Sequence, residues 1–201
     1  MGQLVLATRN VKKLAELRRI LGPVVDVEVL GLDDLPAYDE APETGATFAE
    51  NALAKARDAA AATGLAAVAD DSGLTVDALN GMPGVLSARW SGRHGDDVAN
   101  LELLLAQISD VPDEQRGAAF VCAAAFVVPG GREQVLEAEM RGRIIREPRG
   151  GGGFGYDPIF VGEGETMTAA EMSPGAKDAI SHRGKAFRAL VPIVRQELSG
   201  T

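Results

Sequence analysis

The stretch AAVADDSGL, residues 66–74, decides the expected fold, because a short apolar run in it meets two adjacent acids. A run of this length bounded by Gly64 and Gly73 is typical of a buried strand. Side chains alternate along a strand, so Asp70 and Asp71, at its end, are expected to point to opposite faces. Burying a carboxylate is costly unless it is paired, so one of the two acids is expected to face a cleft and hold a cation. The alternative is that both acids start a turn and cap the next segment of the chain.

Composition limits the class of protein. The chain has 201 residues, of which 46% are hydrophobic, enough for a sizeable core, and we expect a single domain over residues 1–201. The net charge of −9 argues against a nucleic acid polymer as partner, because binding a phosphate backbone needs a broad cationic surface. No targeting segment and no run of about 18 apolar residues occurs, so we expect a soluble, cytoplasmic protein without a membrane partner. Cys122 lies in an apolar run and is expected to be a buried thiol.

The N-terminal segment predicts a strand, a polar turn and a helix. Residues 4–7 form a short apolar run, and residues 14–21 repeat leucine and isoleucine at helical spacing. Backbone N–H groups at a helix N-terminus, together with lysines, favour phosphate binding, although the P-loop spacing is absent. An ordinary capped helix with solvated lysines is the alternative. The candidate phosphate-binding residues are Thr8, Asn10, Lys12 and Lys13.

An acidic loop and a long helix are expected next. Residues 24–30 predict a second strand, and residues 31–44 are rich in proline and acids. The motif TFAE at 47–50 has the spacing of a capping box, and the alanine-rich segment after it predicts a helix to residue 63. Lys55 lies on this helix, either as a ligand or as a solvated side chain.

The remainder predicts a mixed sheet with further helices. A strand is expected at 74–79, an amphipathic helix at 96–108, and a hairpin of two antiparallel strands at 118–128 and 133–145. Ser173 and Pro174 have the spacing of a helix start, and a C-terminal helix with a kink at Pro192 follows residues 181–185.

A glycine tract, RGGGGFGYDP, occupies residues 149–158. Three of its glycines match GxGxxG in letters, but the dinucleotide fingerprint opens a helix, and here a proline follows instead. The glycines are expected to make room for a flat ligand beside Phe154. A flexible linker is the alternative.

Five motifs occur in one order along the chain: TxNxxK at 8–13, TFxENA at 47–52, ADDSGL at 69–74, GFGYDP at 153–158 and SHRG at 181–184. Together they resemble the inosine triphosphate pyrophosphatase family, over nearly the whole chain. Members of that family hydrolyse non-standard (non-canonical) purine nucleoside triphosphates, dITP, ITP and XTP, to the monophosphate and pyrophosphate. The resemblance implies an α/β fold with a long twisted mixed sheet flanked by helices, two lobes with the active site in the groove between them, and a homodimer.

The resemblance also implies roles for individual residues. Asp71 would bind Mg²⁺ and act as the catalytic acid or base, with Glu43 as a second metal ligand and Glu40 as its possible substitute. Phe154 would stack on the base. Position 9 is Arg, where the resemblance implies a small residue. The implied phosphate-binding residues are Thr8, Arg9, Asn10, Val11, Lys12, Lys13 and Lys55, and those implied to contact the rest of the substrate are Ser72, Phe154, Gly155, Tyr156, Asp157, Lys177, His182 and Arg183.

The residue types suit this chemistry independently of the resemblance. Phosphoryl transfer needs charge neutralisation and an aligned nucleophile, and Mg²⁺ takes carboxylate oxygens without a His or Cys cluster. Lys177 and Arg183 are hydrogen-bond donors, so they favour a base edge with acceptors such as O6. Two other interpretations stay open. A Maf-type pyrophosphatase of modified pyrimidine or standard nucleotides is disfavoured by the TxNxxK start, and a non-catalytic nucleotide sensor by the adjacent acids at 70–71.

Overall fold

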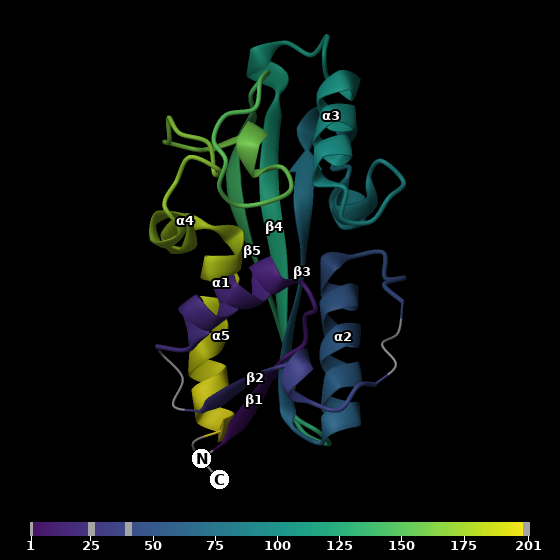
Figure 1. Cartoon of the computed structure of the whole chain (residues 1–201), viewed down its shortest axis with the longest axis vertical. Coiled ribbons are helices and arrows are strands. Elements are labelled where there is room, and N and C mark those ends of the chain that lie inside the picture. Colours follow the sequence, from purple (N-terminus) through teal and green to yellow (C-terminus); the bar gives the residue numbers. More distant parts are fainter. Residues whose placement is uncertain (1, 24–26, 39–41, 199–201) are drawn as a thin grey trace. The chain divides into compact units, whose positions relative to one another are not determined.

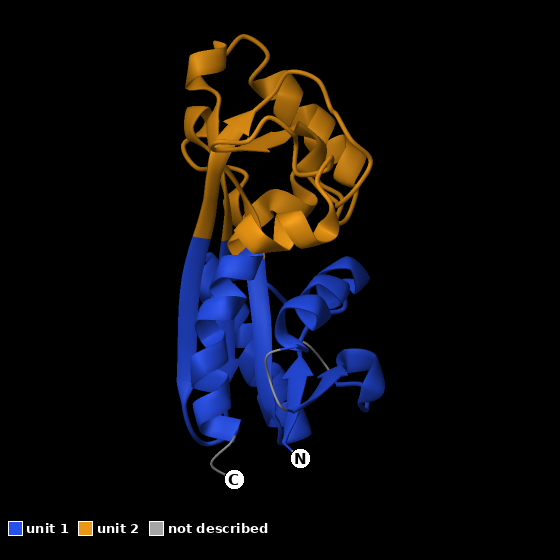
Figure 2. Ribbon diagram, turned by 90° about the vertical axis from the view of Figure 1, so that its left-hand side faces the viewer, with its two compact units in different colours: residues 1–71, 122–138, 183–201 blue, residues 72–121, 139–182 orange. Residues whose placement is uncertain are grey.

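The computed structural model describes residues 2–23, 27–38 and 42–198. The chain divides into two compact units (Figure 2). Unit 1 comprises residues 1–71, 122–138 and 183–201, and unit 2 comprises residues 72–121 and 139–182. No helix in the described part of the chain is long and apolar enough to cross a bilayer.

One six-stranded sheet runs through the chain (Figure 1), with the strand order β2-β1-β3-β4-β5-β6. β1 pairs in parallel with both β2 and β3, whereas β5 pairs antiparallel with β6, so the sheet is mixed, as predicted. Residues of β3, β4 and β5 belong to both units. The strands are β1 (Gln3–Leu6), β2 (Glu28–Gly31), β3 (Ala66–Val76), β4 (Gly117–Val127), β5 (Glu133–Ile144) and β6 (Phe160–Gly162).

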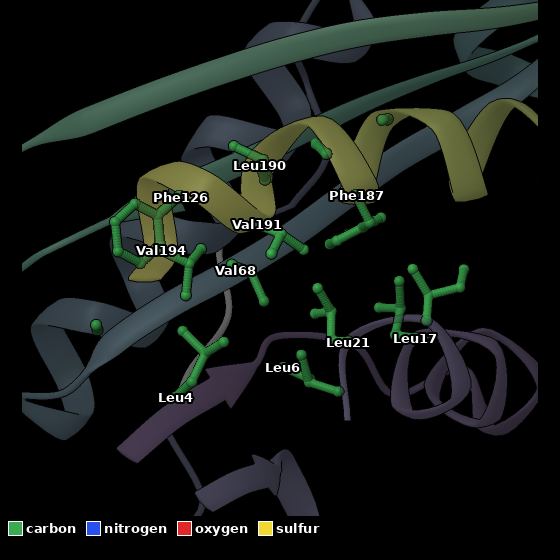
Figure 3. Packing of buried hydrophobic residues seen from close by; sticks show 14 of the residues in the cluster. Leu4, Leu6, Leu17, Leu21, Val68, Phe126, Phe187, Leu190, Val191 and Val194 are labelled. Atoms are coloured by element: carbon green, nitrogen blue, oxygen red, sulfur yellow. The ribbon is translucent and has the colours of Figure 1, made fainter. Parts of the chain in front are cut away.

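The core of unit 1 lies between strands and two helices, α1 (Val11–Leu21) and α5 (His182–Leu198) (Figure 3). Alternate residues of β1, β3 and β4 point into it, which is the period of a strand with one face on this core. α5 continues through Pro192 to its end at Leu198. The labelled core residues are Leu4, Leu6, Leu17, Leu21, Val68, Phe126, Phe187, Leu190, Val191 and Val194.

The longest helix that lies wholly in unit 1, α2 (Phe48–Thr63), begins with the predicted capping box. Thr47 Oγ1 accepts the Glu50 N–H at 3.2 Å, and the Glu50 carboxylate accepts the Thr47 N–H at 3.3 Å. Gly64 ends the helix with a φ of 70°, a left-handed conformation that favours glycine. Buried alanines at helical spacing form one face of α2.

Unit 2 has its own core, which includes one face of α3 (Asp97–Gln107). Asp96 caps this helix by accepting the Ala99 N–H at 3.2 Å. The helix predicted at 96–108 repeats apolar residues at helical spacing, and of these Leu101 and Leu104 are buried, whereas Val98 is 66% exposed. α4 (Pro174–Ile180) starts at the predicted Ser173 cap.

Two strand predictions need correction. β3 does not end at the two acids but continues to Val76, so the strand predicted at 74–79 is its continuation. The acids do not interrupt β3 because folding supplies both with partners from helices. Glycine at position 73 also allows β3 to continue past the two acids, because a Cβ at this position would clash with Ser87. β2 begins at Glu28, and residues 24–26 of the predicted second strand lie outside the described residues.

Candidate active site

The carboxylates of Asp70 and Asp71 are both buried in the middle of β3 and face different helices, as strand alternation predicts. Asp70 accepts hydrogen bonds from Lys13 Nζ at 3.0 Å and from Arg183 Nε at 3.2 Å. Arg183 also donates to Glu16 on α1. Burial alone would raise the pKa of Asp70, but the neighbouring cations, Lys13 foremost, outweigh it and lower that pKa. Asp70 is therefore a stable anion that ties α1 and α5 to β3.

Asp71 faces α2. Its Oδ2 accepts from Asn51 Nδ2 at 3.0 Å, and its Oδ1 lies 3.4 Å from Lys55 Nζ. Lys55 Nζ also donates to Glu43 Oε1 at 2.9 Å. Burial raises the pKa of Asp71 and outweighs the opposing charge of Lys55. The two carboxylates implied as metal ligands, Asp71 and Glu43, therefore converge on one ammonium group.

This arrangement fits a hard divalent cation. Carboxylate oxygens are ligands that Mg²⁺ prefers, and one or two of them usually suffice when water and substrate phosphates complete the coordination. Within residues 2–23, 27–38 and 42–198, no group of three or more His, Cys, Asp or Glu could hold a metal ion. A metal bound by Asp71 and Glu43 would therefore need oxygens from elsewhere. Glu40, the implied substitute for Glu43, lies outside the described residues.

The predicted phosphate loop forms the start of α1. Asn10 Oδ1 accepts the N–H groups of Lys12 and Lys13 at 3.0 and 3.1 Å, and the Asn10 N–H donates to Thr8 Oγ1 at 3.2 Å. Two of the backbone donors expected to receive phosphate are therefore bonded to the helix cap. The Lys13 side chain is not simply solvated, because it is bonded to Asp70 and only 15% exposed. The exposed residues of this loop are Arg9, Asn10, Val11 and Lys12.

A second set of predicted residues lies together in unit 2. Lys177 Nζ donates to Asp157 Oδ2 at 2.5 Å and lies 5.3 Å from the centroid of the Phe154 ring. Asp157 Oδ2 also accepts the Phe154 N–H at 2.8 Å. A half-buried aromatic ring beside a neutralised ion pair suits a flat heterocycle with polar edges.

Some glycines of the tract at 149–158 serve the protein's own packing. Gly153 has a φ of 69°, and a Cβ there would clash with the Asp157 carboxylate. A Cβ at Gly150 would lie 2.6 Å from the backbone of Ala170. At these two positions glycine is required by the protein's own packing, and room for a flat ligand beside Phe154 stays a prediction. No α-helix opens at the tract, which agrees with setting aside the dinucleotide fingerprint.

Three further predicted residues, Gly155, Tyr156 and His182, also belong to unit 2. His182 stacks on Phe120, with ring centroids 5.0 Å apart and planes inclined by 12°. The Gly155 N–H donates to Asp97 Oδ2 at 3.0 Å, and the Tyr156 hydroxyl donates to a backbone carbonyl at 2.9 Å. These contacts hold the Phe154 loop and the start of α5 in place within unit 2.

Two predicted motifs straddle the boundary between the units. The chain passes from unit 1 to unit 2 between Asp71 and Ser72, and returns between His182 and Arg183. Arg183 is therefore grouped with Asp70 in unit 1, whereas Phe154, Asp157 and Lys177, which the resemblance also implies as substrate contacts, belong to unit 2.

Residues with no role assigned from the sequence hold several of these groups. Asn51 donates a hydrogen bond to Asp71. The sequence feature that could have indicated this role is its position one helical turn before Lys55, on the same face of the helix. Asp97 binds the Phe154 loop from 58 residues away in sequence, and no local pattern indicates such a contact.

Comparison with known proteins assigns the chain to a family. A sequence model of the Ham1 family matches residues 4–193. The chain belongs to the Ham1 family. It is 69% identical over 194 residues to the dITP/XTP pyrophosphatase of Nocardia farcinica, covering 96% of this chain and 94% of that protein. It is 61% identical over 200 residues to the dITP/XTP pyrophosphatase of Mycobacterium tuberculosis, covering 98% of each.

Solved structures of Ham1 relatives have the same fold. The crystal structure of a nucleoside-triphosphatase, or dITP/XTP pyrophosphatase, from Mycobacterium abscessus is 63% identical, with a TM-score of 0.77, covering 94% of this chain and 99% of that chain. A HAM1 protein from Coxiella burnetii is 40% identical, with a TM-score of 0.86, covering 98% of this chain and 100% of that chain. The expected α/β fold is confirmed.

Proposed function

We propose that this Ham1 family protein hydrolyses non-standard purine nucleoside triphosphates, dITP, ITP and XTP, to the nucleoside monophosphate and pyrophosphate. The observation that carries the proposal is the convergence of Asp71 and Glu43 on Lys55, a set of carboxylates and a lysine suited to a triphosphate with its cation. The choice of substrate rests on relatives 61% and 69% identical that are named dITP/XTP pyrophosphatases.

The metal we propose is Mg²⁺, held by Asp71 and Glu43. When bound, it would supply neutralisation of the charge on the phosphates. Lys13 and Lys55 would contribute further positive charge, together with the loop at residues 8–12, of which residues 9–12 are exposed. Because the described residues hold no group of three such ligands, water would complete the coordination in the free protein, and the substrate's own oxygens would do so in the complex.

Asp71 is proposed as the general base. Water attacks the α-phosphorus, its proton passes to the Asp71 carboxylate, and the bond from the α-phosphorus to the pyrophosphate oxygen breaks. Burial raises the pKa of Asp71 above that of an ordinary aspartate, which makes it a better proton acceptor near neutral pH.

Base recognition is proposed for the residues of unit 2. Phe154 would stack on the base, and Lys177 would donate to O6 of hypoxanthine or xanthine, whereas the 6-amino group of adenine would meet it donor to donor. Leaving such a donor unmatched costs a factor of about 10² in kcat/KM. Asp157 would orient Lys177, and Arg183 is assigned to holding Asp70. The other residues proposed to line this site are Ser72, Gly155, Tyr156 and His182.

We also propose that the two units act as one domain on a single nucleotide. Asp71, a proposed metal ligand, belongs to unit 1, and the next residue, Ser72, which is proposed to contact the substrate, belongs to unit 2. Proposed site residues of the two units are therefore joined directly by the chain. The protein is further proposed to be a cytoplasmic homodimer, and sedimentation velocity would test the dimer.

The deciding experiment is a coupled assay of pyrophosphate release with ITP, dITP, XTP, ATP, GTP and a modified pyrimidine nucleotide. We expect Mg²⁺-dependent release with ITP, dITP and XTP, and a kcat/KM for ATP lower by about 10². Equal kcat/KM for ITP and ATP would contradict the selectivity. Preference for the pyrimidine would indicate a Maf-type enzyme, and binding without turnover would indicate a sensor. Orthophosphate as the first product would contradict attack at the α-phosphorus.

A further inference from the structure

Asn51, the fourth residue of α2, makes hydrogen bonds through both the nitrogen and the oxygen of its side-chain amide, and it is 1% exposed. Nδ2 donates to Asp71 Oδ2 at 3.0 Å, and Oδ1 accepts the Gly45 N–H at 2.8 Å. A carboxylate only accepts and a backbone N–H only donates, so these partners determine which end of the amide is oxygen. Neither aspartate nor leucine could satisfy both partners at this position.

The amide holds the plane of the Asp71 carboxylate, so that one oxygen binds Asn51 and the other faces Lys55. Because Asn51 occupies Oδ2, the oxygen that lies 3.4 Å from Lys55 Nζ is Oδ1. Lys55 also contacts Glu43, so Oδ1 is the Asp71 oxygen on the side of the second carboxylate. A rotation of the Asp71 side chain that turned its carboxylate out of this plane would break the bond to Asn51.

The other end of the amide holds the segment that follows Glu43. A Cβ at Gly45 would lie 2.6 Å from Asn51 Oδ1, so the close approach of this segment requires glycine. The next two N–H groups, of Ala46 and Thr47, both donate to Glu50 Oε2, at 2.7 and 3.3 Å. The first turn of α2 therefore binds three successive backbone N–H groups just after Glu43.

We propose that Asn51 is a positioning residue that sets the distance and orientation between the two carboxylates of the metal site, Asp71 directly and Glu43 through its own segment. The proposal rests on the function proposed above, in which Asp71 and Glu43 hold the metal. Removing a residue that is hydrogen-bonded to a metal ligand typically lowers the affinity for the metal by about 10–100-fold.

Asn100 provides a matched control. It is the fourth residue of α3, is 2% exposed and likewise bonds at both ends, with Oδ1 accepting the Ser91 N–H at 2.7 Å and Nδ2 donating to the Ala88 carbonyl at 3.3 Å. Its partners are backbone groups and include no carboxylate. Truncating either asparagine leaves buried polar groups without a hydrogen bond and should lower stability to a similar extent.

The test compares Asn51→Ala with Asn100→Ala, using Mn²⁺ as the probe because it takes the same oxygen ligands as Mg²⁺ and its free form is measured by electron paramagnetic resonance. We expect the Mn²⁺ dissociation constant of the nucleotide-free protein to rise by about tenfold or more in Asn51→Ala, and by less than about twofold in Asn100→Ala. Unchanged affinity in Asn51→Ala, or equal losses in both variants, would overturn the proposal.

A measurement on the unmodified protein covers the case in which Asn51→Ala does not fold. In a Mg²⁺ titration followed by ¹H–¹⁵N NMR, the side-chain amide signal of Asn51 should shift as metal binds, and that of Asn100 should not. An Asn51 signal that stays in place while Mg²⁺ saturates the protein would overturn the proposal. Both measurements are independent of turnover, so a failure to hydrolyse any nucleotide would reject the proposed function and leave the role of Asn51 separately decided.

Discussion

Asp70 and Asp71 are neighbours in sequence, yet their environments shift their pKa values in opposite directions. The pKa of Asp70 is lowered, so its ionised form stabilises the fold at pH values above about 4, and this stabilisation is lost as the pH falls towards the folded-state value. Removing one partner of a buried ion pair costs about 3–5 kcal/mol. Asp70→Asn should therefore lower the free energy of unfolding by about 3 kcal/mol at pH 7, measured by urea denaturation. If Asp70→Asn lowered the free energy of unfolding as much in acid as at pH 7, this assignment would be contradicted.

Asp71 should show the reverse behaviour. Its pKa is raised by burial, so ionisation above the unfolded-state pKa disfavours the folded state at neutral pH. Asp71→Asn is therefore expected to leave the melting temperature at pH 7 unchanged or higher, while kcat falls by about 10² or more through loss of the general base. Steady-state kinetics at saturating Mg²⁺ and thermal denaturation check both parts. A variant that keeps most of its kcat would remove Asp71 from the mechanism.

Replacing Arg183 distinguishes a role in holding Asp70 from a role in contacting the purine base. Its Nε and Nη1 are bonded to Asp70 and Glu16, and the side chain is 3% exposed. Arg183→Ala should therefore destabilise the protein by about 3 kcal/mol, for the same reason as Asp70→Asn. The ratio of kcat/KM for ITP to that for ATP should stay the same in the folded fraction. A narrowed ratio would restore the base-contacting role first implied for Arg183.

At the level of elements, the loop around Phe154 depends on its glycines. Gly153 has a left-handed φ, and a Cβ there would clash with Asp157, whereas a Cβ at Gly151 would meet nothing within 4 Å. Gly153→Ala should therefore displace Phe154 and raise KM by about tenfold for every purine substrate, since stacking on a base is worth about 1–3 kcal/mol and tolerates all bases. Gly151→Ala is the control and should have an unchanged KM. Similar KM values for both variants would show that this backbone does not position the ring.

At the level of the whole molecule, the two units should make separable contributions to substrate binding. Lys13 lies in unit 1 with the proposed phosphate-binding residues, and Lys177 lies in unit 2 beside Phe154. Lys13→Ala should weaken inhibition by the product pyrophosphate, because it removes a phosphate-binding charge. Lys177→Ala should leave that inhibition constant unchanged and reduce the preference for ITP over ATP. If both variants weakened pyrophosphate binding equally, the division of labour between the units would be wrong.

Much of the local structure was predictable from the sequence, because it depends on interactions within a few residues. The capping box at Thr47 and the helix start at Ser173 satisfy N–H groups within three residues of the cap. The opposite orientation of Asp70 and Asp71 follows from strand alternation alone. The five motifs were sufficient to indicate the family, since they lie in fixed order along the chain.

Only the tertiary structure decided which partners each charged residue has. Asp70 is bonded to Lys13 and Arg183, which are 57 and 113 residues away in sequence, and no local pattern encodes such separations. The continuation of β3 beyond the two acids depended on these same partners, because isolated carboxylates would disfavour a buried strand. The placement of Arg183 with Asp70, and of Asn51 with Asp71, follows from the path of the chain through the sheet, which brings helices far apart in sequence against opposite faces of one strand.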